Sequence, residues 1–79
     1  MVNIELEFPI ERNGAEVKTL TMRRPKVRDQ IVAEKSSKSE VEKEITLFSN
    51  LLEISPDELQ EVDAKDYQKI QKAFTDFLS

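Results

Sequence analysis

The chain has 79 residues with a formal net charge of −4, and it contains neither cysteine nor histidine. This length allows one domain with a modest core, over residues 1–79. The missing residue types exclude disulfides, thiolate or imidazole metal sites and the commonest general base, while the acidic balance argues against nucleic acid and anionic membranes as partners.

Charge is distributed unevenly along the chain. Residues 1–35 hold seven Lys/Arg and six Asp/Glu, a net of +1, whereas residues 36–79 hold five and ten, a net of −5. No basic start is followed by an apolar run, and no stretch approaches the roughly 20 apolar residues of a membrane helix. We therefore expect neither a signal peptide nor a membrane span, and a protein of the cytoplasm.

Residues 2–24 are expected to form a β-hairpin. Apolar residues at alternate positions predict a half-buried first strand: Val2, Ile4, Leu6 and Phe8. Pro9 is expected near the end of this strand or at an edge, since it cannot donate a hydrogen bond. A second candidate strand covers residues 16–24, and Asn13-Gly14 between them is the strongest short signal for a hairpin turn.

The register of this hairpin depends on the length of its loop. A two-residue loop at Asn13-Gly14 would turn the apolar residues of the second strand to the wrong face. A loop that also includes Arg12 pairs Leu6 with Leu20, and it places Gly14 in the left-handed position of a G1 bulge. The second arrangement, which also pairs Ile4 with Met22, is the one we predict. A bulge near Pro9 would alter this count.

Residues 25–79 are expected to form three to four helices. Pro25 suits the first turn of a helix that runs to about Lys35, after which residues 36–39 form a polar break. Ser37 with Glu40, or Ser39 with Glu42, can then make a capping box for a helix that ends near Leu52. Its apolar residues recur at helical spacing: Val41, Ile45, Phe48 and Leu52, widened by Leu47, Leu51 and Ile54.

Two further helix starts lie in the acidic half. Ser55-Pro56-Asp57-Glu58 combines a capping serine, a proline at the first helical position and a glutamate that reaches back. This predicts a short helix to about Val62 that buries Leu59. Asp63 then caps the last helix, with Asp66 near its positive end. That helix carries an apolar face made of Tyr67, Ile70, Phe74, Phe77 and Leu78.

The chain offers no persuasive catalytic or metal-binding set. Its serines lie in caps and loops, and no histidine can activate them. The carboxylates near residues 57–66 are explained by helix starts, and their spacing does not match a calcium loop. We therefore expect no enzyme activity, no metal and no cofactor.

Two groups of residues have both a structural and a functional interpretation. The cluster Arg23, Arg24, Lys26 and Arg28 is either a solvated connection between strand and helix or a site for an acidic partner or nucleic acid. The helical apolar residues are either core alone or core that also contributes to a groove for a partner. On the second interpretation, the residues that contact the partner are Leu47, Leu51, Ile54, Phe74, Phe77 and Leu78.

The order of motifs resembles a known family. Leu20–Asp29 reads LTMRRPKVRD and is followed by Ala33-Glu34-Lys35; residues 51–59 read LLEISPDEL, residues 62–67 read VDAKDY, and residues 74–78 read FTDFL. The set is similar to the small tail-assembly chaperones of Mu-type contractile-tailed phages, and the resemblance covers nearly the whole chain. Lys26 stands where that family is expected to have threonine.

The resemblance implies a protein-binding role without catalytic residues. Its partner would be the tape measure protein, an extended apolar helical chain that must stay soluble until the tail tube forms around it. Self-association is a further possibility. Such a chaperone is expected in the cytoplasm of the host bacterium and absent from the mature virion, which separates it from a structural subunit. The alternative function is a small regulator or adaptor that uses the basic segment Arg23–Arg28.

Overall fold

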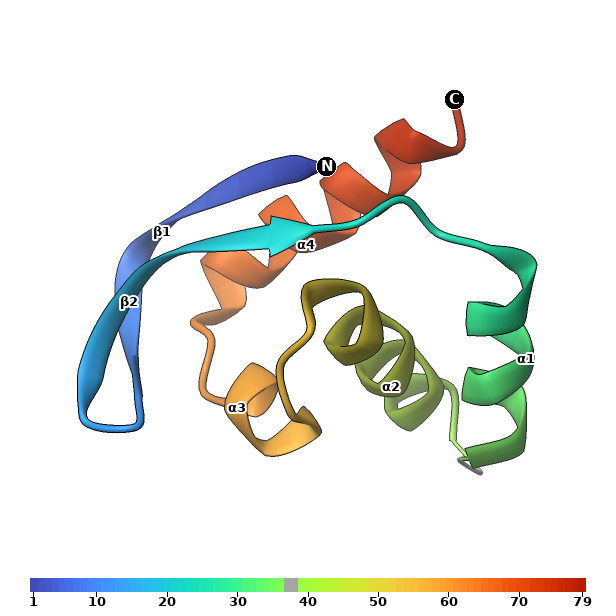
Figure 1. Cartoon of the computed structure of the whole chain (residues 1–79), viewed down its shortest axis with the longest axis horizontal. Helices are drawn as coiled ribbons and strands as arrows, with labels where there is room; N and C mark the ends of the chain where they lie inside the picture. The colour runs from blue at the N-terminus through green and yellow to red at the C-terminus, as the bar shows by residue number, and fades with distance from the viewer. Residues whose placement is uncertain (37–38) are drawn as a thin grey trace.

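A β-hairpin opens the chain and four helices follow it in the computed structural model, which describes residues 1–36 and 39–79 (Figure 1). The elements are β1 (Val2–Arg12), β2 (Ala15–Met22), α1 (Val27–Ser36), α2 (Glu40–Leu52), α3 (Pro56–Gln60) and α4 (Ala64–Phe77). The predicted α+β fold, a two-stranded hairpin with three to four helices, is confirmed.

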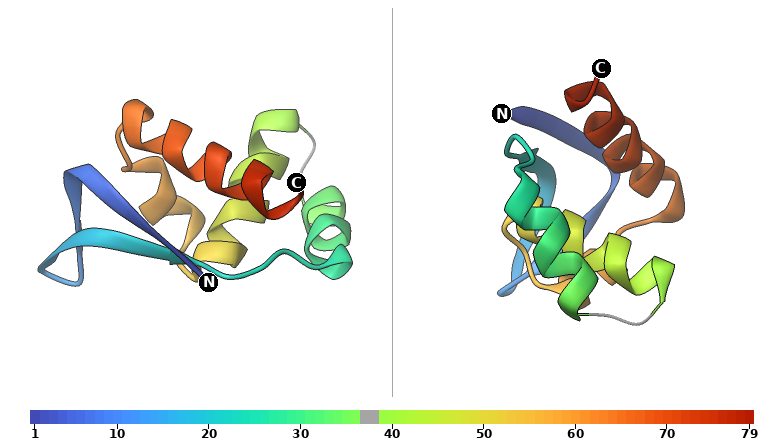
Figure 2. Two further views of the ribbon diagram at one scale, coloured as in Figure 1. Left: turned by 90° about the horizontal axis from the view of Figure 1, so that it is seen from above. Right: turned by 90° about the vertical axis from the view of Figure 1, so that its right-hand side faces the viewer.

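The helices α2, α3 and α4 pack on one side of the hairpin, because that is where its apolar face lies. α4 runs along β1 and α2 contacts β2, while Arg12 beside the turn pairs with Glu58 of α3 at 2.6 Å. α1 lies at the end of the molecule opposite the hairpin turn and packs chiefly against α2 (Figure 2). The connection between β2 and α1 is held to α2, since the N–H of Arg23 donates to the carbonyl of Leu51 at 3.0 Å.

The turn of the hairpin differs from the prediction. Arg12 pairs with Ala15, so only Asn13 and Gly14 form the loop, and both have positive φ (55° and 79°). Positive φ at both central residues is typical of a type I′ turn, which matches the twist of the flanking strands. The predicted three-residue loop with a G1 bulge is therefore wrong, although Gly14 does adopt the left-handed conformation.

The reason is an irregularity in β1. Ile4 pairs with Leu20 rather than with the predicted Met22, and the register shifts between Glu5 and Ile10. Residues 6–9 of β1 therefore lie opposite Lys18 alone, in the region of Pro9, which has no N–H to give to the partner strand. Because of this bulge, Ile10 lies on the buried face opposite Val17. A two-residue turn is therefore compatible with the apolar pattern of both strands.

Asp66 of α4 accepts the hydrogen bonds that the bulged backbone cannot make to β2. Its side chain is fully buried, and its two carboxylate oxygens accept from the N–H groups of Glu7 and Phe8, each at 2.9 Å. Lys69 lies 3.3 Å from the same carboxylate. Burial by itself would raise the pKa of Asp66, but these donors outweigh it and hold the pKa below its usual value.

The core lies between the hairpin and helices α2 to α4. Its buried apolar residues are Ile4, Leu6, Ile10, Leu20, Met22, Phe48, Leu51, Leu52, Ile54, Leu59, Val62, Ile70 and Ala73. Of the four residues predicted on the inner face of the first strand, Ile4 and Leu6 are buried, whereas Phe8 is 50% exposed and Val2 is also exposed. The prediction is wrong for these two because Phe8 lies within the bulge and Val2 lies at the free end of the strand.

The starts of α2, α3 and α4 follow from capping side chains, as predicted, whereas α1 begins at Val27, so Pro25 precedes its first turn instead of lying within it. Ser39 caps α2, Ser55 and Glu58 form a capping box on α3, and Asp63 caps α4. Each cap accepts a hydrogen bond from an N–H of the first helical turn, which otherwise has no partner. The alternative start at Ser37 lies outside the described residues.

Gly14→Ala is expected to lower the free energy of unfolding by about 1 kcal/mol, because a side chain at φ 79° strains the backbone. No atom lies within 4 Å of an added Cβ, so the cost comes from the backbone alone. Urea unfolding measures the change. Gly14→Asn is the control, since asparagine tolerates this conformation and should cost less. Equal losses in the two variants would contradict the type I′ turn.

Candidate functional site

An open groove lies between α1, α2 and α4, with a volume of about 560 Å³. Its apolar lining comes from all three helices: Ala33, Val41, Leu47, Phe48 and Phe74. Charged and polar side chains at its rim include Glu34, Glu40, Lys43, Glu44 and Gln71. An apolar floor with a polar rim is the arrangement that binds an amphipathic helix.

Phe48 of α2 and Phe74 of α4 line the floor of this groove, and Tyr67, which does not line it, packs against Phe48. The ring of Phe48 lies 5.8 Å from Tyr67 and 5.4 Å from Phe74, in tilted geometry. The hydroxyl of Tyr67 donates to Glu44 at 3.0 Å, and the amide of Gln71 donates to the same carboxylate at 2.8 Å. Burial and the nearby Glu44 raise the pKa of Tyr67. These contacts fix α2 against α4, so the floor exists before any partner arrives.

The rim of the groove is acidic. Lys43 lies 3.1 Å from Glu34 of α1 and 3.3 Å from Glu40, and the hydrogen bond to Glu34 is the main cause of its raised pKa. The rim carries three carboxylates (Glu34, Glu40 and Glu44) and one lysine, so its net charge is −2. A partner with cations beside its apolar residues would complement this rim.

Three of the residues predicted as partner contacts lie in or just after α2, and they differ in exposure: Leu47, Leu51 and Ile54. Leu47 lines the groove and is partly buried. Leu51 is fully buried and Ile54 is 7% exposed, so both belong to the core that joins α2 to the hairpin and α3. Contact with a partner stays a prediction for all three residues, and Leu47 is the one that lines this groove, since Leu51 and Ile54 are buried.

The three α4-side residues are separated in the same way. Phe74 lines the groove beside Leu47. Phe77 is partly buried beneath Arg24, whose guanidinium lies 5.8 Å from the centre of its ring. Leu78 is 62% exposed at the end of the chain and does not line the groove. The groove thus unites Leu47 and Phe74 from the predicted set.

The basic segment is not a single solvent-facing patch. Arg23 lies 2.7 Å from Asp29, a buried residue that also accepts from the N–H of Lys26 at 2.8 Å. The hydrogen bond from Arg23 lowers the pKa of Asp29 despite its burial. Arg24 lies over Phe77 but is exposed, as are Lys26 and Arg28, so Arg23 is the member of the set that is held within the fold.

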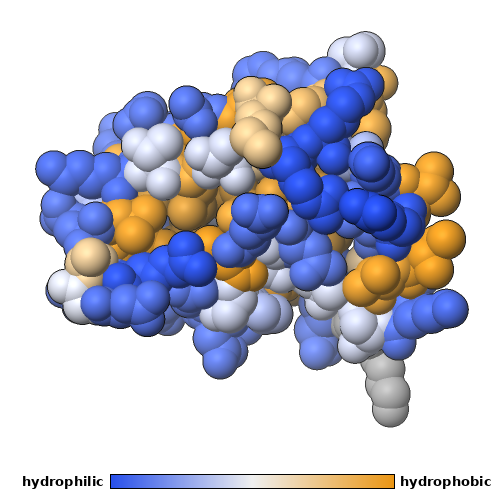
Figure 3. Space-filling model, viewed as in Figure 1, coloured by the Kyte–Doolittle hydropathy of each residue, from blue (hydrophilic) through white to orange (hydrophobic). Residues whose placement is uncertain are grey.

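Sequence reasoning overlooked one member of the groove and one apolar surface. Val41 was predicted in the apolar stripe of its helix but not among the partner contacts, yet it is 71% exposed and lines the groove. Val27, Ile31 and Val32 are exposed on α1, where apolar surface gathers at the right-hand edge of the molecule (Figure 3). The four-residue spacing of Val27 and Ile31 marked a helix, but spacing alone does not tell which face is covered.

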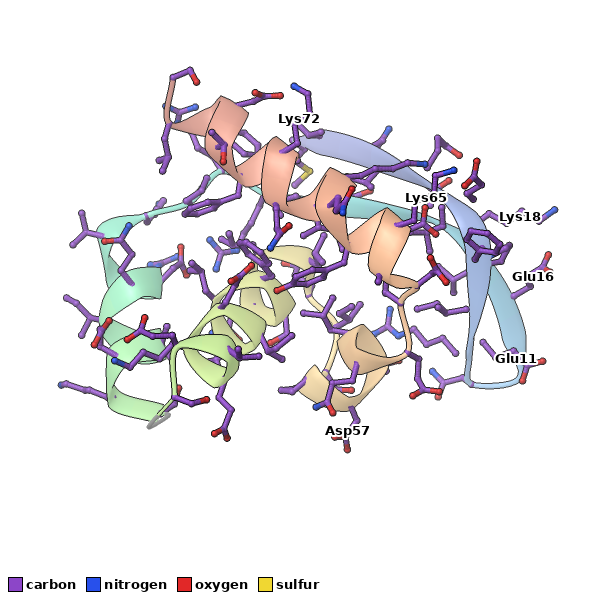
Figure 4. All side chains as sticks on the ribbon, turned by 180° about the vertical axis from the view of Figure 1, so that it is seen from behind. Glu11, Glu16, Lys18, Asp57, Lys65 and Lys72 are labelled. Carbon is purple, nitrogen blue, oxygen red and sulfur yellow. The ribbon has the colours of Figure 1, made fainter. Side chains whose placement is uncertain are left out.

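The rest of the surface is mainly polar. Charged side chains of the hairpin, α3 and α4 point outward (Figure 4). Within residues 1–36 and 39–79, no cluster of three or more acidic side chains could hold a metal ion. In the same part of the chain, no helix is long and apolar enough to cross a membrane.

A small α+β body with a preformed, apolar-floored groove is typical of a protein-binding domain. Residues 3–79 match the family described as "Phage tail assembly chaperone proteins, E, or 41 or 14", and the chain belongs to this family. The resemblance seen in the order of its motifs is thereby confirmed at the level of the tail assembly chaperones. No curated protein and no solved structure gave a match.

Proposed function

We propose that the chain binds the tape measure protein and keeps it soluble until the tail tube assembles. Membership of the tail assembly chaperones supports an assembly role with a protein partner. The observation that carries the finer proposal is the groove between α1, α2 and α4, whose floor is apolar and already formed. Such a groove accepts the apolar face of a helix, and helical segments are what an unassembled tape measure chain is expected to expose.

Weak binding at many sites would suit this role. A chaperone has to cover a long chain and later leave it, so each contact should exchange easily. Several copies along one tape measure chain protect it together, because avidity compensates for the low affinity of each contact. The excess of carboxylates in residues 36–79 would keep the coated chain soluble.

The proposed role also implies where and when the chain acts. The chain would act in the cytoplasm of the host bacterium, where tails assemble, and would leave before the tube closes around the tape measure protein. It should therefore be absent from purified virions, and mass spectrometry of purified particles tests this point. Its presence there in stoichiometric amounts would instead indicate a structural subunit.

The decisive experiment is co-expression with the tape measure protein of the same phage. The wild-type chain should move the tape measure protein into the soluble fraction, and Leu47→Asp should abolish this effect, because a carboxylate on the floor opposes burial of an apolar segment. Gln68→Asp is the matched control, since it adds the same charge at an exposed position of α4 outside the groove.

Circular dichroism must show that both variants are folded, because Leu47 also touches the core. If folded Leu47→Asp keeps the tape measure protein soluble as well as Gln68→Asp does, the groove is not the contact surface. If the wild-type chain has no effect on solubility, the proposed partner itself is wrong.

A further inference from the structure

The carboxylates of the groove gather towards the end where α1 leads into α2. Glu40 is the first residue of α2 and Glu44 follows one turn later, while Glu34 of α1 is drawn to this end by its ion pair with Lys43 at 3.1 Å. Lys43 also lies 3.3 Å from Glu40, and it is the one cation among the described residues that line the groove. This end therefore keeps a negative charge that Lys43 balances only in part.

Glu44 is held in place by neutral donors. The hydroxyl of Tyr67 donates to its carboxylate at 3.0 Å, and the amide of Gln71 donates to it at 2.8 Å. The raised pKa of Tyr67 keeps this hydroxyl protonated at neutral pH. The two contacts thus orient the carboxylate without neutralising it, and its charge remains available to a cation of a partner.

The large apolar side chains of the groove lie further along the same helix. Leu47 and Phe48 follow the two carboxylates of α2 by one to two turns, and Phe74 of α4 packs on Phe48 with 5.4 Å between ring centres. With a rise of 1.5 Å per residue, about 5–12 Å along the axis of α2 separate the carboxylates from these side chains. The groove therefore has an acidic end, to which Val41 adds exposed apolar surface, and an apolar end.

We infer that the groove selects helical segments of its partner in which a lysine or arginine lies one to two turns away from large apolar residues. This inference rests on the proposed function and specifies which segments of the tape measure protein are bound. Apolar contact is non-directional, so the apolar end alone accepts any helix with an exposed apolar stripe. The carboxylates add discrimination, because they attract a cation placed opposite them and repel an aspartate or glutamate.

The discrimination should be moderate and should depend on salt. The side chain of Glu34 is 69% exposed and that of Glu40 is 92% exposed, so each pairs with a partner cation as a surface charge does. Two such pairs together change affinity by about tenfold. Salt screens charges of this kind, so the preference should weaken as ionic strength rises.

Two synthetic peptides test the selection directly. Both have about 20 residues and the same leucine stripe at helical spacing, but one carries lysines one to two turns from the leucines and the other carries glutamates there. Fluorescence anisotropy at low salt should show that the wild-type chain binds the lysine peptide about tenfold more tightly or better. In Glu40→Gln/Glu44→Gln the difference should fall below about threefold, because an amide keeps a hydrogen-bonding oxygen but carries no charge.

Glu11→Gln/Glu16→Gln is the matched control. It removes the same two charges at exposed positions of the hairpin outside the groove, so it should discriminate as the wild type does (Figure 4). Circular dichroism must show that the variants are folded. If the first groove variant is not, Glu34→Gln/Glu40→Gln takes its place, since it leaves Glu44 and its contacts with α4 intact.

The selection is overturned if the wild-type chain binds the two peptides equally, if it binds neither, or if a folded groove variant discriminates as the wild type does. Co-expression with the tape measure protein judges the proposed function separately. A chain that keeps the tape measure protein soluble but does not distinguish the peptides contradicts the selection alone. A chain that distinguishes the peptides but leaves the tape measure protein insoluble supports the charge selection of the groove and contradicts the proposed partner.

Discussion

Asp66→Asn is expected to lower the free energy of unfolding by about 3 kcal/mol, because the amide cannot accept from both N–H groups of the bulge. The Nδ2 of asparagine would instead point a donor at the N–H of Glu7 or Phe8. For 79 residues, total stabilities of about 4–12 kcal/mol are usual, so this one change removes a large part of it. Urea or thermal unfolding followed by circular dichroism measures the difference.

The matched control for this variant is Asp76→Asn, on the same helix. Asp76 is exposed and pairs with Lys72, also exposed, at 3.0 Å, so its loss should cost less than about 0.5 kcal/mol. If Asp66→Asn is as stable as this control, the bulge does not depend on the carboxylate.

The carboxylate of Asp66 should also make the stability of the fold depend on pH. The folded-state pKa of Asp66 lies below its ordinary value, and so does that of Asp29. A group of this kind contributes stability that is complete above the unfolded pKa of about 3.9 and is lost as pH falls through the lower folded pKa. Stability should therefore decrease below about pH 4, and less steeply in Asp66→Asn. An unchanged slope in that variant would show that other groups govern acid unfolding.

Leu51→Ala is expected to lower the free energy of unfolding by about 3 kcal/mol, the usual cost of a cavity at a fully buried leucine. Leu51, in the last turn of α2, is 0% exposed in the core, and its carbonyl accepts from the N–H of Arg23 in the β2–α1 connection. Leu78→Ala is the control, because Leu78 is 62% exposed and its truncation should change stability by less than about 0.5 kcal/mol. Chemical denaturation of both variants compares them directly.

This pair of variants also tests the assignment of the two leucines. The sequence offered both as contacts for a partner, whereas the structure places only Leu78 at the surface. If Leu51→Ala and Leu78→Ala were equally stable, Leu51 would not be part of the core, and a role for it in partner binding would again be open.

Local chemistry explains why the element order could be predicted from the sequence. Ser55 with Glu58 caps α3 and Asp63 caps α4 through hydrogen bonds that span only two or three residues. The alternation of Ile4 and Leu6 marks a strand for the same reason, because neighbouring side chains point to opposite faces. The ordered motifs from Leu20 to Leu78 were likewise sufficient to indicate the family.

Only tertiary contacts decided the register of the hairpin and the position of the functional surface. The bulge in β1 is stable because Asp66, 58 residues further along the chain from Phe8, supplies acceptors for its N–H groups. No local pattern encodes that contact. The exposure of Val41 and the burial of Leu51 likewise depend on where α1 and the hairpin pack, because a helical apolar pattern shows which residues share a face but not what covers that face.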